Sequence, residues 1–182
     1  MNSSKVILLA LASAVLVSCG EKPEAGNSAE TEETASLQDS PLSDVFLSEE
    51  PSNAISVSEA RGQAEPGKEL VVTGKIAGVF QPFTEGFATA VLGDVEMKTC
   101  DLTGDDGCES PWDACCADPE EVKTQRLTIQ VLGEDGMPIA EGLKGINGLK
   151  EMDVLVVSGT VNETSTEENL ILDLTGIFQK ES

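Results

Sequence analysis

The sequence predicts a small all-β domain, a closed barrel of five strands, with an acidic N-terminal segment that stays disordered. Three observations support this prediction. Five apolar, β-branched stretches lie between residues 69 and 178, Gly- and Asp-rich turns separate them, and residues 19–53 contain few large apolar side chains. A chain of 182 residues is long enough for one such domain and a tail.

The predicted strands follow from composition and from the turns that bound them. The third, for example, reads RLTIQVL and ends in the turn sequence GEDG. Gly74 and Gly159 interrupt the first and fourth strands, which indicates a bulge or a sharp bend at each position. The five predicted strands are residues 69–79, 87–92, 126–132, 154–161 and 170–178.

Two short helical segments are expected around these strands. Residues 56–63 form one helical turn, with Ser58 as a possible N-cap and Gly62 near its end. Residues 137–152, between the third and fourth strands, form a short helix or a loop, because several glycines there oppose a long helix.

The order of these elements is that of the OB-fold, a small Greek-key barrel with a helical segment between its third and fourth strands. The stretches VVTGKI (71–76) and VVSGTV (156–161) also resemble the V-x-V-x-G-x-V strands common in that superfamily. The resemblance covers residues 68–178 and predicts a five-stranded OB-like barrel within a domain of residues 54–182. Another small β-barrel or a β-sandwich is the alternative.

The first residues are predicted to be a targeting signal. Lys5 precedes an apolar run, residues 6–17, that is too short to span a bilayer as a helix. The run ends in Leu16-Val17-Ser18-Cys19, which resembles the bacterial lipobox. That resemblance implies a signal peptide at residues 1–18, a lipid on Cys19 and attachment to a membrane of the cell envelope. An ordinary secretory signal or an uncleaved anchor is the alternative.

Residues 19–53 are predicted to be a disordered acidic tether between lipid and barrel. Only Val45-Phe46-Leu47 interrupts its polarity. We interpret this triplet as a transient cluster in a linker, with a short docking segment as the alternative.

Composition excludes several functions. The chain carries 33 acidic and 11 basic side chains, a net charge of −22, so an electrostatic nucleic-acid interface is not expected. The absence of histidine excludes Ser-His-Asp and Cys-His catalysis and His-ligated metals.

The most unusual segment is a cysteine-rich insertion at residues 98–120, between the second and third strands. It contains Trp112 and every cysteine except Cys19. The sequence PWDACC (111–116) resembles a P-W-D-x-C-C motif of small exported proteins of planctomycete-type bacteria, which implies an origin and no activity. The clustered cysteines are Cys100, Cys108, Cys115 and Cys116.

Three roles for these cysteines compete. Export to an oxidising compartment favours two disulfide bonds, with Cys115 and Cys116 each bridging to Cys100 or Cys108. A soft-metal site for Cu⁺, Zn²⁺ or an Fe–S cluster is the second role, although adjacent cysteines suit a single tetrahedral ion poorly. An exchanging thiol–disulfide pair is the third. The carboxylates among them are interpreted as a solvated acidic loop, not a calcium site.

Four aromatic side chains are candidates for packing or binding. Trp112 is either an anchor for a partner or a cover over the cysteines. Phe80, Phe83 and Phe87 are predicted to be core at one end of the barrel.

The whole sequence thus predicts a non-enzymatic, lipid-anchored envelope domain without a cofactor. Its loop is stapled by disulfide bonds, and the domain binds a protein or a small ligand. The alternative is a thiol-based metal-binding or redox protein.

Overall fold

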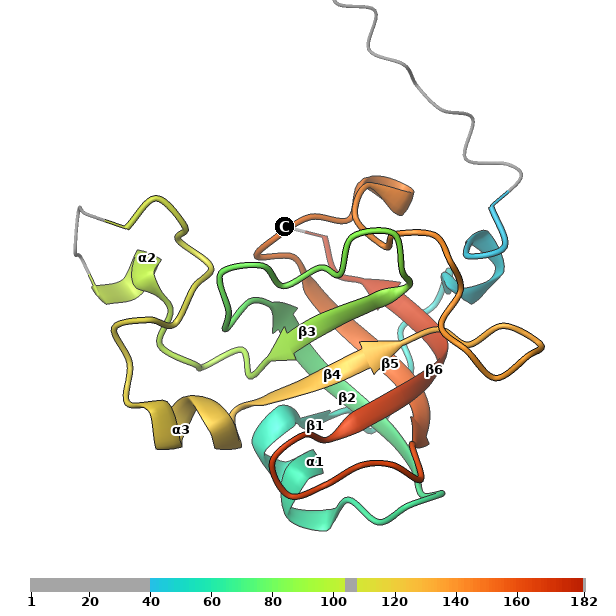
Figure 1. Ribbon diagram of the computed structural model, residues 1–182, viewed down its shortest axis with the longest axis horizontal. Helices are drawn as coiled ribbons and strands as arrows, with labels where there is room; N and C mark the ends of the chain where they lie inside the picture. Colours follow the sequence, from blue (N-terminus) through green and yellow to red (C-terminus); the bar gives the residue numbers. More distant parts are fainter. Residues whose placement is uncertain (1–39, 104–107, 182) are drawn as a thin grey trace, which may run out of the picture. The chain divides into compact units, whose positions relative to one another are not determined.

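The computed structural model describes residues 40–103 and 108–181, which form a closed β-barrel (Figure 1). In the described part of the chain, strands pair in the order β1-β2-β3-β4-β6-β5, and a further pairing of β2 with β5 closes the barrel. The pairs β4–β6 and β1–β2 are parallel, and the others are antiparallel. The strands are β1 (Ile55–Ser56), β2 (Glu69–Ile76), β3 (Thr89–Gly93), β4 (Arg126–Gln130), β5 (Val154–Val161) and β6 (Ile171–Gln179).

This architecture confirms the predicted all-β, OB-like Greek-key barrel. The five predicted strands correspond to β2, β3, β4, β5 and β6, and each boundary agrees to within three residues. The two-residue strand β1 is an addition that the sequence did not indicate. The segment between β4 and β5 is a loop with a single 3₁₀ turn, η2 (Ile146–Gly148), so the glycines there leave almost no helix.

The barrel interior is filled by aliphatic side chains that alternate along the strands. In β4, Leu127 and Ile129 point inward while their neighbours are partly exposed. Completely buried members of this core include Val72, Ile76, Leu92, Ile129, Leu155, Leu172 and Ile177.

Glycines allow strands β2 and β5 to approach their neighbours closely. The register of β5 and β6 shifts between Ser158 and Gly159, so the predicted irregularity at Gly159 is a β-bulge. At Gly74 a Cβ atom would lie 2.6 Å from the backbone oxygen of Gly93. Gly74 therefore permits close contact with β3, as expected of a glycine inside a strand.

Helix α1 (Val57–Gln63) lies at one end of the barrel, with Val57 and Ala60 fully buried. Its N-cap is Ser56, so the prediction of Ser58 was wrong by two residues. Ser56 Oγ accepts from the backbone N–H of Glu59 at 3.1 Å, and the Glu59 carboxylate accepts from the backbone N–H of Ser56 at 3.0 Å. This reciprocal pair is a capping box.

Asp94 supports the same helix end from the strand side. Its carboxylate is nearly buried and accepts hydrogen bonds from the backbone N–H and hydroxyl of Ser58, at 3.0 and 2.8 Å, and from the N–H of Glu96 at 3.2 Å. Burial alone would raise the pKa of Asp94. The bonds from Ser58 and Glu96, with the charge of Lys75, outweigh burial and hold that pKa below its ordinary value.

Replacing Asp94 with asparagine should lower the free energy of unfolding by about 1–2 kcal/mol at pH 7, because a charged acceptor of buried hydrogen bonds is lost. The stabilisation by Asp94 is complete above the unfolded-state pKa, near about 4. It is lost as pH falls through the lowered folded-state pKa. Urea unfolding should therefore show the stabilities of the two proteins converging as the pH falls below about 4 and through that lowered pKa. Glu134→Gln, at an exposed turn, should show neither effect, and a constant difference across pH would contradict this role.

The folded domain begins earlier than the sequence indicated. Leu42 is completely buried in the barrel core, and the 3₁₀ turn η1 (Ser43–Val45) follows it. The backbone N–H of Leu47 donates to the carbonyl of Ile177 at 2.7 Å, and Phe46 forms a parallel bridge with that residue. The segment 45–47 is therefore docked on β6, and the boundary of the tether at residue 53 was wrong. Isolated apolar residues among serines and acids hid this docking from composition.

The predicted signal peptide, Cys19 and most of the predicted tether lie outside the described residues. Among the helices that are described, none is long and apolar enough to cross a membrane.

Candidate functional site: a cluster of four thiols

The cysteine-rich segment projects from one side of the barrel between β3 and β4, drawn in yellow-green at the left of Figure 1. We call residues 97–118 the cysteine loop. It contains the short helix α2 (Cys100–Thr103) and leads into helix α3 (Pro119–Thr124). Helix α3 was not predicted, although its signals are present in the sequence: Asp118 caps the N-terminus and Pro119 occupies the first turn.

Backbone hydrogen bonds join the two arms of the cysteine loop. The N–H of Cys100 donates to the carbonyl of Asp113 at 2.8 Å, and the N–H of Asp101 donates to that of Pro111 at 3.1 Å. The N–H of Gly78 donates to the carbonyl of Trp112 at 2.8 Å. The first two bonds bring Cys100 opposite the segment that carries Cys115 and Cys116. The third ties that segment to the end of β2.

A small apolar cluster lies beneath the loop, separate from the barrel core. Its buried members are Ala77, Met97, Ala114 and Val122, with Trp112, Ala117 and Met152 packed against them. Trp112 is half-buried here, and its indole N–H donates to the carbonyl of Phe80 at 2.9 Å. Packing of Trp112 within the cysteine loop is therefore observed, whereas its role as an anchor for a partner stays a prediction.

Lys75 fixes the start of the loop from inside β2. Only 5% of this residue is exposed, and its ammonium donates to the carbonyl of Met97 and to Thr99 Oγ1, each at 3.0 Å. Burial lowers the pKa of Lys75, and the charges of Asp101 and Asp94 offset part of that effect. The lysine thus holds the residues that enter α2, and with them the position of Cys100.

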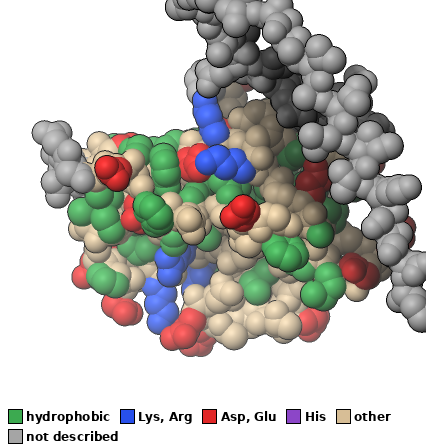
Figure 2. Space-filling view, turned by 45° about the horizontal axis from the view of Figure 1, so that its top comes forward, with side chains coloured by type: hydrophobic (Ala, Val, Ile, Leu, Met, Phe, Trp, Pro, Cys, Tyr) green, Lys and Arg blue, Asp and Glu red, His purple; other side chains and the backbone are tan. Residues whose placement is uncertain are grey.

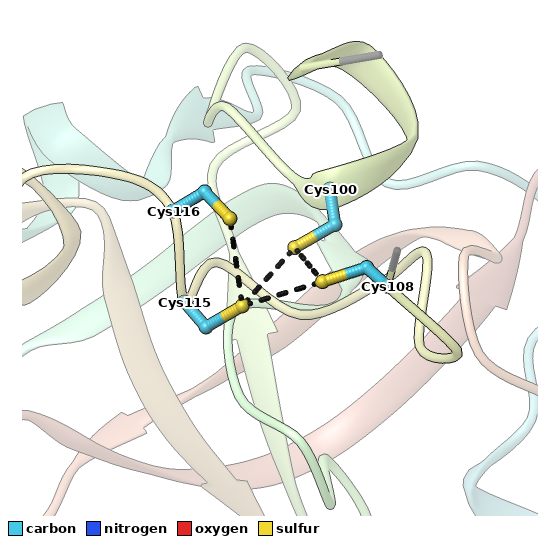
Figure 3. Close-up of side chains that lie close together, drawn as sticks. All are labelled: Cys100, Cys108, Cys115 and Cys116. Atoms are coloured by element: carbon cyan, nitrogen blue, oxygen red, sulfur yellow. Dashed lines mark hydrogen bonds between the residues drawn. The ribbon is translucent and has the colours of Figure 1, made fainter. Parts of the chain in front are cut away.

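The four thiols converge on one point (Figure 3). All four sulfur atoms lie within 4.8 Å of one another. Cys100 Sγ lies 3.2 Å from that of Cys108 and 3.4 Å from that of Cys115. Cys115 Sγ is also 3.4 Å from Cys108 Sγ and 3.7 Å from Cys116 Sγ. Cys100 is buried, Cys108 is half-buried, and Cys115 and Cys116 are exposed.

These separations do not correspond to the predicted disulfide bonds. A disulfide requires about 2.05 Å between sulfurs, and no pair among the four described cysteines approaches that distance. Four thiolates at about 2.3 Å from a central ion would instead lie about 3.8 Å apart. The convergence of all four sulfurs suits one tetrahedral ion, whereas an iron–sulfur cluster spreads its thiolates over several irons.

Sequence reasoning counted the adjacency of Cys115 and Cys116 against a single metal ion. The structure shows how the chain accommodates it: the segment turns after Ala114, and the backbone N–H of Ala117 donates to the carbonyl of Ala114 at 3.0 Å. Within this turn the two sulfurs lie 3.7 Å apart, close to one edge of a thiolate tetrahedron.

The thiols differ in acidity. Burial alone would raise the pKa of Cys100, but hydrogen bonds from the thiols of Cys108, Cys115 and Cys116 outweigh it and lower that pKa. The same contact with Cys100 raises the pKa of Cys108, and contacts with Cys100 and Cys108 raise that of Cys115. Cys100 is therefore the preferred first thiolate of the cluster, and the thiols around it act as hydrogen-bond donors to it.

Several carboxylates of the loop serve its own backbone. Asp113 accepts from the N–H of Ala114 at 2.8 Å, and Asp118 accepts from the N–H groups of Glu120 and Glu121. Asp101 accepts a hydrogen bond from the hydroxyl of Thr99. The carboxylates of Asp101, Asp113 and Asp118 are thus engaged within the loop and the start of α3. Two further carboxylates, Asp105 and Asp106, lie outside the described residues.

The chain matches no protein-family model and no curated protein.

Proposed function

We propose that this chain is a non-enzymatic, lipid-anchored protein of the bacterial cell envelope whose cysteine loop binds a single soft metal ion. The convergence of four thiols on one point carries the metal-binding part of the proposal. The lipobox-like sequence ending at Cys19 supports export and lipid attachment. Partners in the envelope, whether a protein or a small ligand, belong to the same proposal.

Zn²⁺ is the ion that the donor set fits best. Thiolates select soft or borderline cations, and a tetrahedral set of four sulfurs is typical of Zn²⁺. Cu⁺ is the alternative, because it also prefers thiolates. Each thiol that binds loses its proton, and the bound ion then protects the thiolates from oxidation in an exported protein. Two disulfide bonds are the competing state of the same four cysteines.

The proposal is tested on a soluble chain that begins at Gly20 and is exported to an oxidising compartment. We expect metal analysis to find one equivalent of zinc or copper per chain. Native mass should show the ion bound, and alkylation should label all four thiols only after the ion is chelated and the protein is unfolded. A metal-free protein that takes no label and is four hydrogens lighter than the reduced chain would contain two disulfides and would refute the metal site.

A further inference from the structure

An open hollow of about 500 Å³ lies beside the cysteine loop and is independent of the thiols. The loop after β2, residue Trp112 and the segment before β5 form its walls. Three aromatic and three charged side chains contribute to the lining: Phe80, Phe83, Trp112, Glu85, Lys144 and Glu151. Its size and aromatic lining, with a few charged groups, are typical of sites for small ligands.

Phe80, Phe83 and Phe87 were predicted to be core at one end of the barrel, and that prediction was wrong for two of them. Phe80 is 64% exposed and Phe87 is 48% exposed, and only Phe83 packs against the barrel core. Phe80 is therefore largely exposed to solvent in the lining of the hollow. Its carbonyl accepts a hydrogen bond from the indole N–H of Trp112, which lines the hollow as well. Figure 2 shows one face of the molecule, on which hydrophobic side chains are exposed with acidic side chains among them.

The charges of the hollow favour a cation. Lys144 forms an ion pair with Glu151 at 2.5 Å, which leaves Glu85 as the remaining charge in the lining. Glu85 is exposed and takes part in none of the ion pairs found among the described residues. The net charge of −22 on the whole chain adds a long-range field that attracts cations and repels anions.

The hollow already holds one ammonium group against an aromatic ring. The Nζ atom of Lys144 lies 6.0 Å from the centre of the Phe83 ring, within the range of a cation–π contact. Phe80 and Trp112 also line the hollow, so their rings are available to a second cation, and Glu85 would balance its charge.

From the aromatic walls, the unpaired glutamate and the charge of the chain, we propose that this hollow binds a small organic cation of the quaternary ammonium type. Such a cation loses little hydration on binding and is attracted to several ring faces at once. An anionic ligand would meet Glu85 and the negative field of the whole protein, so a phosphate or carboxylate does not fit the site. The inference does not require metal at the thiols, although Trp112 belongs to the cysteine loop.

Trp112 gives a direct measurement of this site. The chain has one tryptophan and no tyrosine, so its intrinsic emission comes essentially from Trp112. The chain beginning at Gly20 is used with whatever metal it retains on purification. Choline added to this protein should change the Trp112 emission in a saturable way. The uncharged compound of the same shape, 3,3-dimethylbutan-1-ol, should bind about ten-fold more weakly, because it lacks the cation–π attraction. Isothermal titration calorimetry should give the same ratio.

Matched variants locate the binding. Phe80→Ala and Glu85→Gln should each weaken choline binding by about three- to ten-fold. Phe87→Ala and Glu134→Gln remove an exposed ring and an exposed acid that do not line the hollow, and should leave binding unchanged. Equal affinity for choline and its neutral analogue, no saturable binding, or insensitivity to Phe80→Ala would each overturn the proposal.

Discussion

Replacing Cys100 with serine should reduce metal affinity by at least about a thousand-fold, because a hydroxyl is a poor ligand for Zn²⁺ or Cu⁺ and the remaining site has only three thiolates. Cys100 is the critical position for two structural reasons. It is the buried member of the cluster, and its sulfur makes the shortest contact, 3.2 Å to that of Cys108. Its pKa is also the one that its neighbours lower, so it is the first thiolate available to an incoming ion. Competition with a chromogenic chelator measures the affinity.

Two controls separate ligand loss from damage to the loop. Asp118→Ala removes the N-cap of α3 and should destabilise the adjacent loop by about 1 kcal/mol, yet it keeps all four thiols and should keep the metal. The far-ultraviolet circular dichroism of Cys100→Ser should remain that of the barrel, because the loop has its own apolar cluster apart from the core. Unchanged metal content in Cys100→Ser would show that the four thiols do not form one site.

The barrel was predictable because its signals are local and repeated. Strand boundaries follow from apolar, β-branched stretches and from turns such as the one at residues 133–136, and these features do not depend on distant contacts. The N-cap was harder to assign. Ser56 and Ser58 are both suitable residues, and the choice depends on Asp94, which lies 36 positions away and takes the N–H of Ser58.

The cysteine site was only partly predictable. The sequence identified the four cysteines but not their arrangement, because compartment and spacing favoured disulfides and the adjacency of Cys115 and Cys116 seemed unsuited to one ion. The convergence depends on Lys75, whose contact with Thr99 spans 24 residues, and on the bond from Gly78 to the carbonyl of Trp112. The exposure of Phe80 is likewise set by tertiary packing, which composition does not record.

The largest effect on stability is expected for a substitution at the bulge in β5. At Gly159 the register shifts, and β6 crosses so closely that a Cβ atom would overlap the carbonyl oxygen of Asp173 and lie 3.0 Å from its carbon. Both atoms belong to the backbone of a strand paired on two sides, with β4 and β5. Neither strand can therefore move without breaking ladder hydrogen bonds.

Gly159→Ala should therefore lower the free energy of unfolding by about 3 kcal/mol, which is a large part of the stability of a domain of this size. The matched control is Gly62→Ala in α1, where a Cβ atom meets nothing within 4 Å and the backbone is helical. That change should instead stabilise the protein by about 0.5–1 kcal/mol, because alanine restricts the unfolded chain and favours the helix. Urea unfolding of both variants measures the two effects. A Gly159→Ala protein as stable as the parent would mean that β5 and β6 do not approach each other closely at this bulge.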